Sequence, residues 1–378
     1  MHIDPFGVEL WMNEFELLCK YNLAETCCDS ITIAELLMLS QQKQDSLNEL
    51  LSMKMTYGAI EGSDRLRSAI ANLYTHQAPS NVLVTHGTIG ANSLVYQTLL
   101  SEGDNVISMV PSYQQHYAIP ASVGATVQKL QLSAKNQFLP DLDHLSKLAT
   151  ANTKLITLTN PNNPTGSLID QSMLNEIAAI ARKSNAWILC DEVYRGIDQM
   201  DPGTTSSMAD LYEKGISTAS VSKVFSLAGL RLGWISAPSD VIDAVMIHRD
   251  YNTISVGMIN DHIASIALEN HQSILERNKA LTRNNLAILS DWVEAEPLIS
   301  WVKPRSGTVA LLKYELDIPS RAFCVNLLNE TGVLLTPGSA MDMEGYVRIG
   351  FANATDVLES GLPLLSEYLA KIAQSSSN

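Results

Sequence analysis

The spacing of apolar residues changes twice along the chain and divides it into three parts. In the first part, residues 8–20 carry apolar side chains at the spacing of an amphipathic helix. A second short helix is predicted over residues 31–39, with Asp29 and Ser30 as the residues that cap its start. This first part, residues 1–45, is therefore expected to form an N-terminal arm.

The middle part alternates short apolar runs with amphipathic segments such as residues 171–183. The predicted strands are Val82–Val84, Asn105–Met109, Thr126–Leu130, Leu155–Leu158, Ala186–Cys190, Thr218–Val221 and Leu232–Ser236. Such alternation is typical of an α/β fold in which a mostly parallel sheet carries helices on both faces. We expect one large α/β domain over residues 46–255.

The last part begins near residue 256 and has a different pattern. A long helical stretch is predicted over residues 258–294, and strand-like runs follow at 299–302 and 308–313. The sequence therefore predicts a smaller α+β domain over residues 256–378, with which the N-terminal arm packs. A chain of 378 residues is longer than one hydrophobic core usually serves, which agrees with two domains.

Composition narrows the classes of partner. The net charge of −15 argues against nucleic acid, because its phosphates would be repelled. No apolar run reaches the roughly 18 residues of a membrane span, and the first residues have neither the basic flank nor the apolar core of an export signal. The five cysteines lack a repeating spacing, and the adjacent Cys27 and Cys28 lack the spacer of common metal sites. We expect a cytoplasmic protein with reduced thiols and no metal.

Three motifs lie at the ends of predicted strands, where ligand sites form in open α/β sheets. They are Asn160–Gly166 (NPNNPTG), Cys190–Tyr194 (CDEVY) and Ser220–Trp234 (SVSKVFSLAGLRLGW). Taken singly, the first is an ordinary turn, the second is a helix cap and the third is a solvated loop with one lysine. The three occur in this order about thirty residues apart, and their combination indicates a shared site.

These motifs resemble those of the fold-type-I pyridoxal 5′-phosphate (PLP) enzymes, in the aminotransferase class I/II branch, over nearly the whole chain. Further matching residues are Tyr57, Gly58, Glu61, Gly62, Leu66, Arg67, Thr85–Thr88, Pro111–His116, Arg231 and Tyr346–Arg348. The resemblance implies the aspartate-aminotransferase-like fold, in which the large domain binds PLP and the arm is an active-site lid. It also implies that PLP is the cofactor and that Lys223 holds it as a Schiff base.

The resemblance assigns roles around the PLP ring. Lys223 would carry the cofactor, and its neighbourhood should favour the neutral amine or the Schiff base. Asp191 would keep the pyridine nitrogen protonated, so that the ring accepts charge. Tyr194 and Asn163 would hydrogen-bond the phenolic oxygen of the ring, and Tyr113 would stack on its face. Lys223, Asp191 and Tyr194 are thus the expected catalytic residues.

The phosphate is expected at the start of a helix, where backbone N–H groups favour an anion. Its predicted partners are the N–H groups of Gly87, Thr88 and Ile89, the hydroxyls of Ser220 and Ser222, and the guanidinium of Arg231. Tyr57 resembles the tyrosine that reaches the partner subunit's phosphate, which implies a homodimer with shared sites. Arg348 resembles the arginine that clamps the substrate α-carboxylate. His116 would orient Asp191 from behind, and His86 is either a packing residue or an active-site residue.

One segment departs from the family pattern. The arm usually carries a glycine-rich run over the substrate, but residues 22–32 (NLAETCCDSIT) are acidic and free of glycine. One interpretation is an ordinary capped helix start at Asp29. The other is a lid whose Glu25 or Asp29 binds a cationic side chain. This segment and residues 249–255 resemble, over short stretches, a natural-product group that acts on arginine and includes capreomycidine synthase and the PLP-dependent O2-using arginine oxidases.

Three functions follow from these observations. The first is O2-dependent oxidation of L-arginine, or of a similar cationic amino acid, through a quinonoid carbanion in natural-product biosynthesis. The second is an aminotransferase that uses a 2-oxo acid as acceptor. The third is a non-catalytic sensor, since this fold also serves as the effector domain of bacterial regulators. The third is disfavoured by the full set of site residues around Lys223, by the net charge and by the lack of a DNA-binding segment before residue 1.

Overall fold

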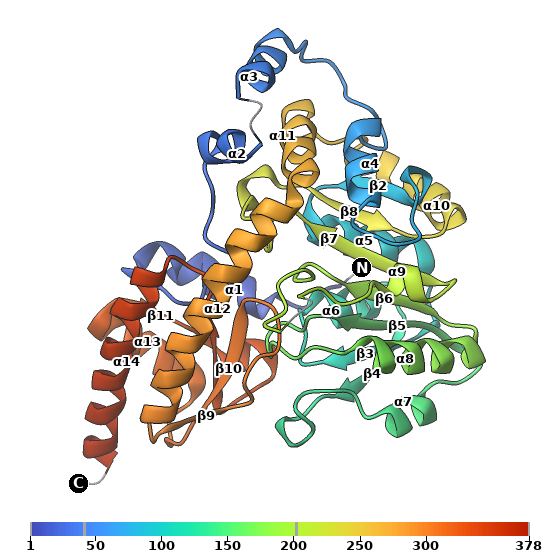
Figure 1. Cartoon of the computed structure of the whole chain (residues 1–378). Helices are drawn as coiled ribbons and strands as arrows, with labels where there is room; N and C mark the ends of the chain where they lie inside the picture. Colours follow the sequence, from blue (N-terminus) through green and yellow to red (C-terminus); the bar gives the residue numbers. More distant parts are fainter. Residues whose placement is uncertain (1, 41–42, 201–202, 377–378) are drawn as a thin grey trace.

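The computed structural model describes residues 2–40, 43–200 and 203–376. It contains a large α/β domain and a smaller α+β domain, and the long helix α12 (His271–Ala295) runs from one to the other (Figure 1). The N-terminal helix α1 (Gly7–Phe15) lies between the two domains, whereas helices α2 (Ile33–Leu39) and α3 (Lys43–Ser52) lie at the upper end of the molecule in Figure 1.

The large domain is built on a seven-stranded sheet. Its strands are β2 (Val82–Thr85), β3 (Asn105–Val110), β4 (Thr126–Gln131), β5 (Thr153–Thr159), β6 (Trp187–Asp191), β7 (Gly215–Ser220) and β8 (Gly233–Ser236). Their order is β2-β8-β7-β6-β5-β3-β4, and β8 runs antiparallel to both of its neighbours while the other pairs are parallel. All seven strands were predicted, with bounds that differ by at most three residues.

The central strands are buried on both faces, which is why strands such as β3 and β6 carry apolar residues on both sides. Successive residues of a strand point to opposite faces, so Ile188 and Cys190 of β6 pack in one core while Leu189 packs in the other. The helices of the first core are α7 (Leu142–Leu148), α8 (Gln171–Ser184) and α9 (Met208–Leu211). Those of the second are α5 (Gly87–Leu99) and α10 (Ser239–Asp250), beside α6 (Gln115–Ser122).

A third core joins the large domain to the segment after residue 256. Helix α4 (Asp64–Ala71) and helix α11 (Met258–Glu269) pack here with residues of β2 and β8. The predicted helical stretch over 258–294 consists of two helices, because Asn270 between them does not have helical backbone angles. Since α11 and Ile274 at the start of α12 belong to this core, we propose that the boundary between the domains lies within α12 rather than at residue 255.

The small domain contains a four-stranded antiparallel sheet of order β12-β13-β10-β9. Its strands are β9 (Ile299–Trp301), β10 (Val309–Tyr314), β12 (Thr336–Pro337) and β13 (Tyr346–Gly350). The helices α12, α13 (Ser320–Thr331) and α14 (Thr355–Ser376) cover it, and Trp11 of α1 and Leu23 of the arm complete the same core. In addition, β1 (Tyr21–Asn22) pairs with β11 (Val333–Leu334), so the arm is joined to the small domain.

The start of α2 differs from the prediction. The cap is Thr32, whose hydroxyl accepts from the Glu35 amide while the Glu35 carboxylate accepts from the Thr32 amide. Asp29 was expected to cap this helix, but its carboxylate pairs with Arg277 of α12 at 3.1 Å. Within the described ranges, no helix combines the length and the apolar character needed to cross a membrane.

Candidate active site

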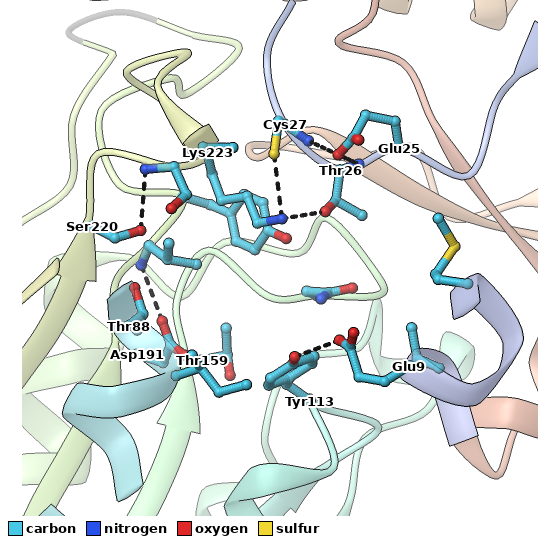
Figure 2. A pocket seen from close by; sticks show the side chains of 18 of the residues that line it. Glu9, Glu25, Thr26, Cys27, Thr88, Tyr113, Thr159, Asp191, Ser220 and Lys223 are labelled. Atoms are coloured by element: carbon cyan, nitrogen blue, oxygen red, sulfur yellow. Dashed lines mark hydrogen bonds between the residues drawn. The ribbon is translucent and has the colours of Figure 1, made fainter. Parts of the chain in front are cut away.

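A cavity of about 330 Å³ lies at the carboxyl edge of the large sheet. Thr159, Asp191 and Ser220 end the neighbouring strands β5, β6 and β7 and line one side of it. Figure 2 shows Glu9, from α1, and Glu25, from the arm, on the side opposite Thr88 and Ser220. The sheet thus meets the N-terminal segments of the chain across one cavity, which is where α/β folds bind their ligands.

Asp191 is buried at one end of this cavity, and its carboxylate accepts two hydrogen bonds and lies near His116. Its Oδ2 accepts a hydrogen bond from the Asn92 amide at 2.9 Å and lies 3.4 Å from Nε2 of His116. Its Oδ1 accepts from the Val193 backbone N–H at 3.1 Å. Burial of an ionised carboxylate costs free energy unless hydrogen bonds or a cation compensate it. The hydrogen bonds compensate part of this cost, and a positively charged ligand group beside Asp191 would compensate more.

His116 lies behind Asp191. It is fully buried, and its Nδ1 lies 2.7 Å from the Tyr96 hydroxyl, which also contacts Thr157 at 2.8 Å. His116 is not one of the cavity-lining side chains in the described part of the chain. This geometry agrees with the expected role of orienting Asp191.

Lys223 projects its amino group into the cavity. Its Nζ donates to the Thr26 hydroxyl at 2.7 Å and lies 3.5 Å from the sulfur of Cys27 (Figure 2). Burial disfavours the ammonium form, but the electrostatic effects of Cys27, Tyr194 and Glu25 and the hydrogen bond to Cys27 outweigh burial, so the pKa of Lys223 is raised. The raised pKa favours the ammonium form in the chain without its cofactor, and the Schiff base at Lys223 stays a prediction.

Glu25 lines the cavity, but its carboxylate also binds its own backbone. Its Oε1 accepts from the N–H groups of Thr26 at 2.6 Å and Cys27 at 2.8 Å. Burial raises the pKa of Glu25, yet Lys223 and these amides outweigh it and the net pKa is lowered. Asp29, the other expected acidic residue, does not line the cavity in the described structure, because it pairs with Arg277.

Two further glutamates, neither of them predicted from the sequence, line the same wall. Glu9 of α1 accepts a hydrogen bond from the Tyr113 hydroxyl at 2.6 Å. Glu16 begins the short 3₁₀ helix after α1, and burial together with Glu25 and Glu9 raises its pKa. The two are seven residues apart, which is two helical turns, so their spacing was a signal that they share a face.

Arg348, on β13, closes the end of the cavity on the side of the small domain. Its side chain is buried, and its Nη1 donates to Oδ1 of Asn163 at 3.1 Å and its Nη2 to the Thr336 hydroxyl at 3.2 Å. Its Nε is buried and has no partner within the described residues. Burial lowers the pKa of Arg348, while Tyr194 and Glu25 oppose the shift. A fixed guanidinium with an unused donor is suited to a carboxylate ligand.

The opposite end of the cavity offers donors to an anion. Helix α5 begins at Gly87, whose φ of +68° is a conformation that favours glycine, and Thr88 and Ile89 line the cavity in its first turn. Gly233 permits the contact of β8 with this turn, because a Cβ there would lie 2.4 Å from the Gly87 carbonyl carbon. The buried Thr88 hydroxyl has no partner among the described residues, as expected of a group that awaits a ligand.

The other expected phosphate ligands lie at the same end. Ser220, Ser222 and Arg231 line the cavity, and the Ser220 hydroxyl accepts from the Ser222 N–H at 3.2 Å. His86 directly precedes the helix, and burial together with Arg249 and Arg231 lowers its pKa, so it is neutral. Tyr57 is 81% exposed and lies outside the cavity of its own chain in the described structure, so its predicted contact requires a second subunit.

These residues fit PLP. The cavity has an anion-binding helix start with an unpaired hydroxyl, a buried carboxylate that accepts hydrogen bonds, and a primary amine. Those are the groups that a phosphate, a pyridine nitrogen and an aldehyde need. Tyr113, Asn163 and Tyr194 also line the cavity, so the described structure brings together every predicted PLP-binding residue except Tyr57 and Gly87, and Gly87 directly precedes the lining residue Thr88.

The comparisons with known proteins agree with this geometry. Residues 36–358 match the family "Aminotransferase class I and II". Capreomycidine synthase from Streptomyces vinaceus is 28% identical over 368 residues, which cover 97% of this chain and 94% of that protein. An aspartate aminotransferase from Pyrococcus abyssi is also 28% identical, over 345 residues, which cover 87% of this chain and 88% of that protein.

Solved structures extend the similarity to the fold. A PLP-dependent aminotransferase from Streptococcus suis 89-1591 superposes with a TM-score of 0.95 at 42% identity, covering 98% of this chain and 99% of that one. The PLP-dependent cyclase OrfR superposes with a TM-score of 0.91 at 26% identity and covers 98% of both chains. The predicted fold class and cofactor are confirmed. The chain belongs to the aminotransferase class I and II family and is a PLP-dependent enzyme of amino-acid metabolism with the aspartate-aminotransferase-like fold.

Proposed function

We propose that this enzyme oxidises L-arginine, or a similar cationic L-amino acid, with O2 as the electron acceptor. The observation that carries the proposal is the row of three glutamates, Glu9, Glu16 and Glu25, on the wall of the cavity formed by the N-terminal segments. Burial raises the pKa of Glu16, and the charges of Glu25 and Glu9 raise it further, so Glu16 is close enough to be repelled by both. Such a group is stabilised by a cationic ligand.

The remaining charges of the cavity have other partners. Arg231 faces the phosphate end, Arg348 faces the substrate carboxylate, and Asp191 is held for the pyridine nitrogen. Lys223 ceases to be a free cation once the cofactor is attached to it. The three glutamates are then left with no cation of their own among the described cavity residues, and a cationic side chain of the substrate supplies one.

The other side chains orient the reactants. Gly87, Thr88, Ile89, Ser220, Ser222 and Arg231 bind the phosphate, and Tyr57 of a second subunit adds a hydroxyl in a homodimer. Tyr113 stacks on the ring, while Asn163 and Tyr194 hydrogen-bond its phenolic oxygen. When bound, PLP takes up the electron pair left at the substrate α-carbon. Lys223 moves the proton at that carbon, and Arg348 fixes the α-carboxylate.

The same three glutamates also affect which electron acceptor can enter the cavity. An aminotransferase must admit a second substrate into this cavity, and a dicarboxylate such as 2-oxoglutarate would meet three carboxylates there. Dioxygen is small and uncharged, so it is not repelled. In the proposed reaction the amino acid loses two electrons and two protons, which reduce O2 to hydrogen peroxide. Water then replaces the amino group by a carbonyl oxygen, and ammonia is released.

An aminotransferase is the second candidate, because a protein described as a PLP-dependent aminotransferase shares 42% identity with this chain. Measurements of amino-acid binding test the preference for a cationic side chain without testing whether O2 is the electron acceptor. Citrulline has the shape of arginine but lacks its charge. We expect arginine to perturb the visible spectrum of the enzyme at concentrations at least about tenfold lower than citrulline does, since a charge-assisted bidentate pair contributes about 1.5–3 kcal/mol. Equal affinities would refute the cationic specificity.

A further inference from the structure

The hydroxyl of Thr26 is held against the amino group of Lys223 by bonds to its own backbone. The Thr26 side chain is 9% exposed, and its Oγ1 accepts from Nζ of Lys223 at 2.7 Å. Its N–H donates to Oε1 of Glu25 at 2.6 Å, and its carbonyl accepts from the Thr308 hydroxyl at 2.7 Å. Both backbone groups of this residue are therefore fixed, and the hydroxyl is directed at the lysine.

The arm and the lysine loop are joined at a second point. The Cys28 N–H donates to the backbone carbonyl of Lys223 at 3.1 Å, so residues 26–28 contact both the backbone and the side chain of the lysine. Gly350 of β13 lets the arm approach the sheet, because a Cβ there would lie 1.7 Å from the Glu25 carbonyl oxygen. This part of the arm is packed in place and has the fixed geometry that a positioning group needs.

We propose that Thr26 is a positioning residue for Lys223, whose hydroxyl accepts a hydrogen bond from the lysine amino group and holds that group toward the cofactor site. The inference rests on the proposed role of Lys223 as the cofactor lysine, and it does not depend on which amino acid is the substrate. A hydroxyl acceptor stabilises the ammonium more than the amine, so Thr26 also restrains the loss of the lysine proton.

The charged and titratable groups that face Lys223 set the background for this effect. They are Cys27, Tyr194, Glu25, Glu16 and Cys28. Burial raises the pKa of Cys27 to about 11 and also raises the pKa values of Cys28 and Tyr194, so these three groups are neutral at physiological pH. Glu25 has a lowered pKa and is ionised, so it is the main anion near the lysine. Replacement of the Thr26 hydroxyl removes its hydrogen bond with the Lys223 amino group and leaves the negative charge of Glu25 in place.

The test is the pH dependence of PLP capture by the full-length chain after its cofactor has been removed. Capture requires the neutral amine, and its rate is followed by visible absorbance without any substrate. Thr26→Val should move the midpoint of the rate profile to lower pH by about 0.5–1 unit, because the ammonium loses one hydrogen-bond acceptor. Thr26→Ser should restore the wild-type midpoint, since it keeps the hydroxyl.

Unchanged midpoints in both variants would overturn the proposal. If Thr26→Val does not fold, Thr308→Val serves instead, because it releases the Thr26 carbonyl and leaves the hydroxyl in place. That variant should shift the midpoint in the same direction by a smaller amount, and no shift would also overturn the proposal. Lys223→Ala tests separately whether Lys223 is the cofactor lysine. Covalent capture of PLP by that variant would show that another lysine holds the cofactor, and it would not bear on which amino acid is the substrate.

Discussion

The hydroxyl of Tyr113 donates a hydrogen bond to the carboxylate of Glu9 at 2.6 Å. Tyr113 follows β3 of the large domain, and Glu9 belongs to α1, so this bond connects the aromatic side chain expected on the cofactor ring with the wall expected to bind the substrate side chain. The ring of Phe6 packs on Tyr113 at a centroid distance of 4.6 Å and supports the same contact. The cofactor site and the proposed specificity site are therefore built by adjacent groups.

The first prediction concerns the glutamates themselves. Glu9→Gln and Glu16→Gln should each weaken arginine binding by about tenfold and leave citrulline binding within about twofold, because each removes one charge and keeps the shape of the side chain. Spectral titration of each variant with both amino acids measures the effect. Asp29→Asn is the matched control, since its carboxylate pairs with Arg277 outside the cavity. Equal losses for arginine and citrulline would mean that the glutamates have only a packing role.

The second prediction follows from the Tyr113–Glu9 bond. Tyr113→Phe should weaken arginine binding by about threefold to tenfold, since the Glu9 carboxylate loses the donor that orients it. The double variant Tyr113→Phe, Glu9→Gln should be little worse than Glu9→Gln alone, because the two residues act through one contact. Additive losses in this cycle would show that the two side chains act independently.

The third prediction concerns the anion-binding end of the cavity. Thr88→Val removes a buried hydroxyl that has no partner among the described residues. If that hydroxyl binds the phosphate, the variant should hold PLP about fivefold less tightly, as expected for one hydrogen bond of about 1 kcal/mol. Equilibrium dialysis against the cofactor gives the dissociation constant. Thr98 lies near the other end of α5, so the control variant Thr98→Val should leave the dissociation constant of PLP unchanged. A Thr88→Val protein that binds PLP like the wild type would contradict the assignment of Thr88 to the phosphate.

The fourth prediction is a pH dependence of stability. Glu25 has a lowered pKa in the folded chain, so its contribution is present above its ordinary pKa of 4.5 and is lost as the pH falls through the folded value. Lys223 has a raised pKa, so its contribution is present below its ordinary value of 10.5 and is lost only as the pH rises through the folded value. Both groups therefore make their full contribution to the free energy of unfolding between pH 4.5 and pH 10.5.

Glu25→Gln should therefore lower the unfolding free energy of the cofactor-free chain by about 1 kcal/mol near neutral pH. The difference from the wild type should narrow as the pH falls below 4.5, where the wild-type carboxylate also loses its charge. Urea denaturation at several pH values measures both effects. A difference that is constant across this range would show that the charge of Glu25 does not stabilise the fold.

The large sheet and the cofactor end of the site could be predicted because their signals are local. Strands buried on both faces are recognisable as short uncharged runs, and the residues at their carboxyl ends, such as Asp191 and Ser220, lie at the edge where ligands bind. The predicted start of α2 was wrong, although Thr32 and Glu35 have the local Thr-x-x-Glu spacing of a capping box. Asp29 has the chemistry of a cap, but tertiary contacts with Arg277 and with the carbonyl of Ala352 occupy its polar groups.

The specificity wall could not be predicted because it depends on how α1 packs. The indole of Trp11 donates to the Leu335 carbonyl at 3.0 Å, and the Gly7 N–H donates to the Gln114 side chain at 2.8 Å. These contacts between residues more than a hundred positions apart set the rotation of the helix and direct Glu9 into the cavity. A helical pattern alone shows that Glu9 and Glu16 share a face, but not what that face meets.

The most direct test of the central claim is oxygen consumption by the PLP-loaded enzyme with L-arginine and no 2-oxo acid. We expect O2 uptake with release of one ammonia per O2 consumed and accumulation of hydrogen peroxide, and we expect little uptake with citrulline. Absence of O2 uptake with arginine, together with stoichiometric formation of alanine or glutamate when pyruvate or 2-oxoglutarate is added, would contradict the oxidase and show that the enzyme is an aminotransferase.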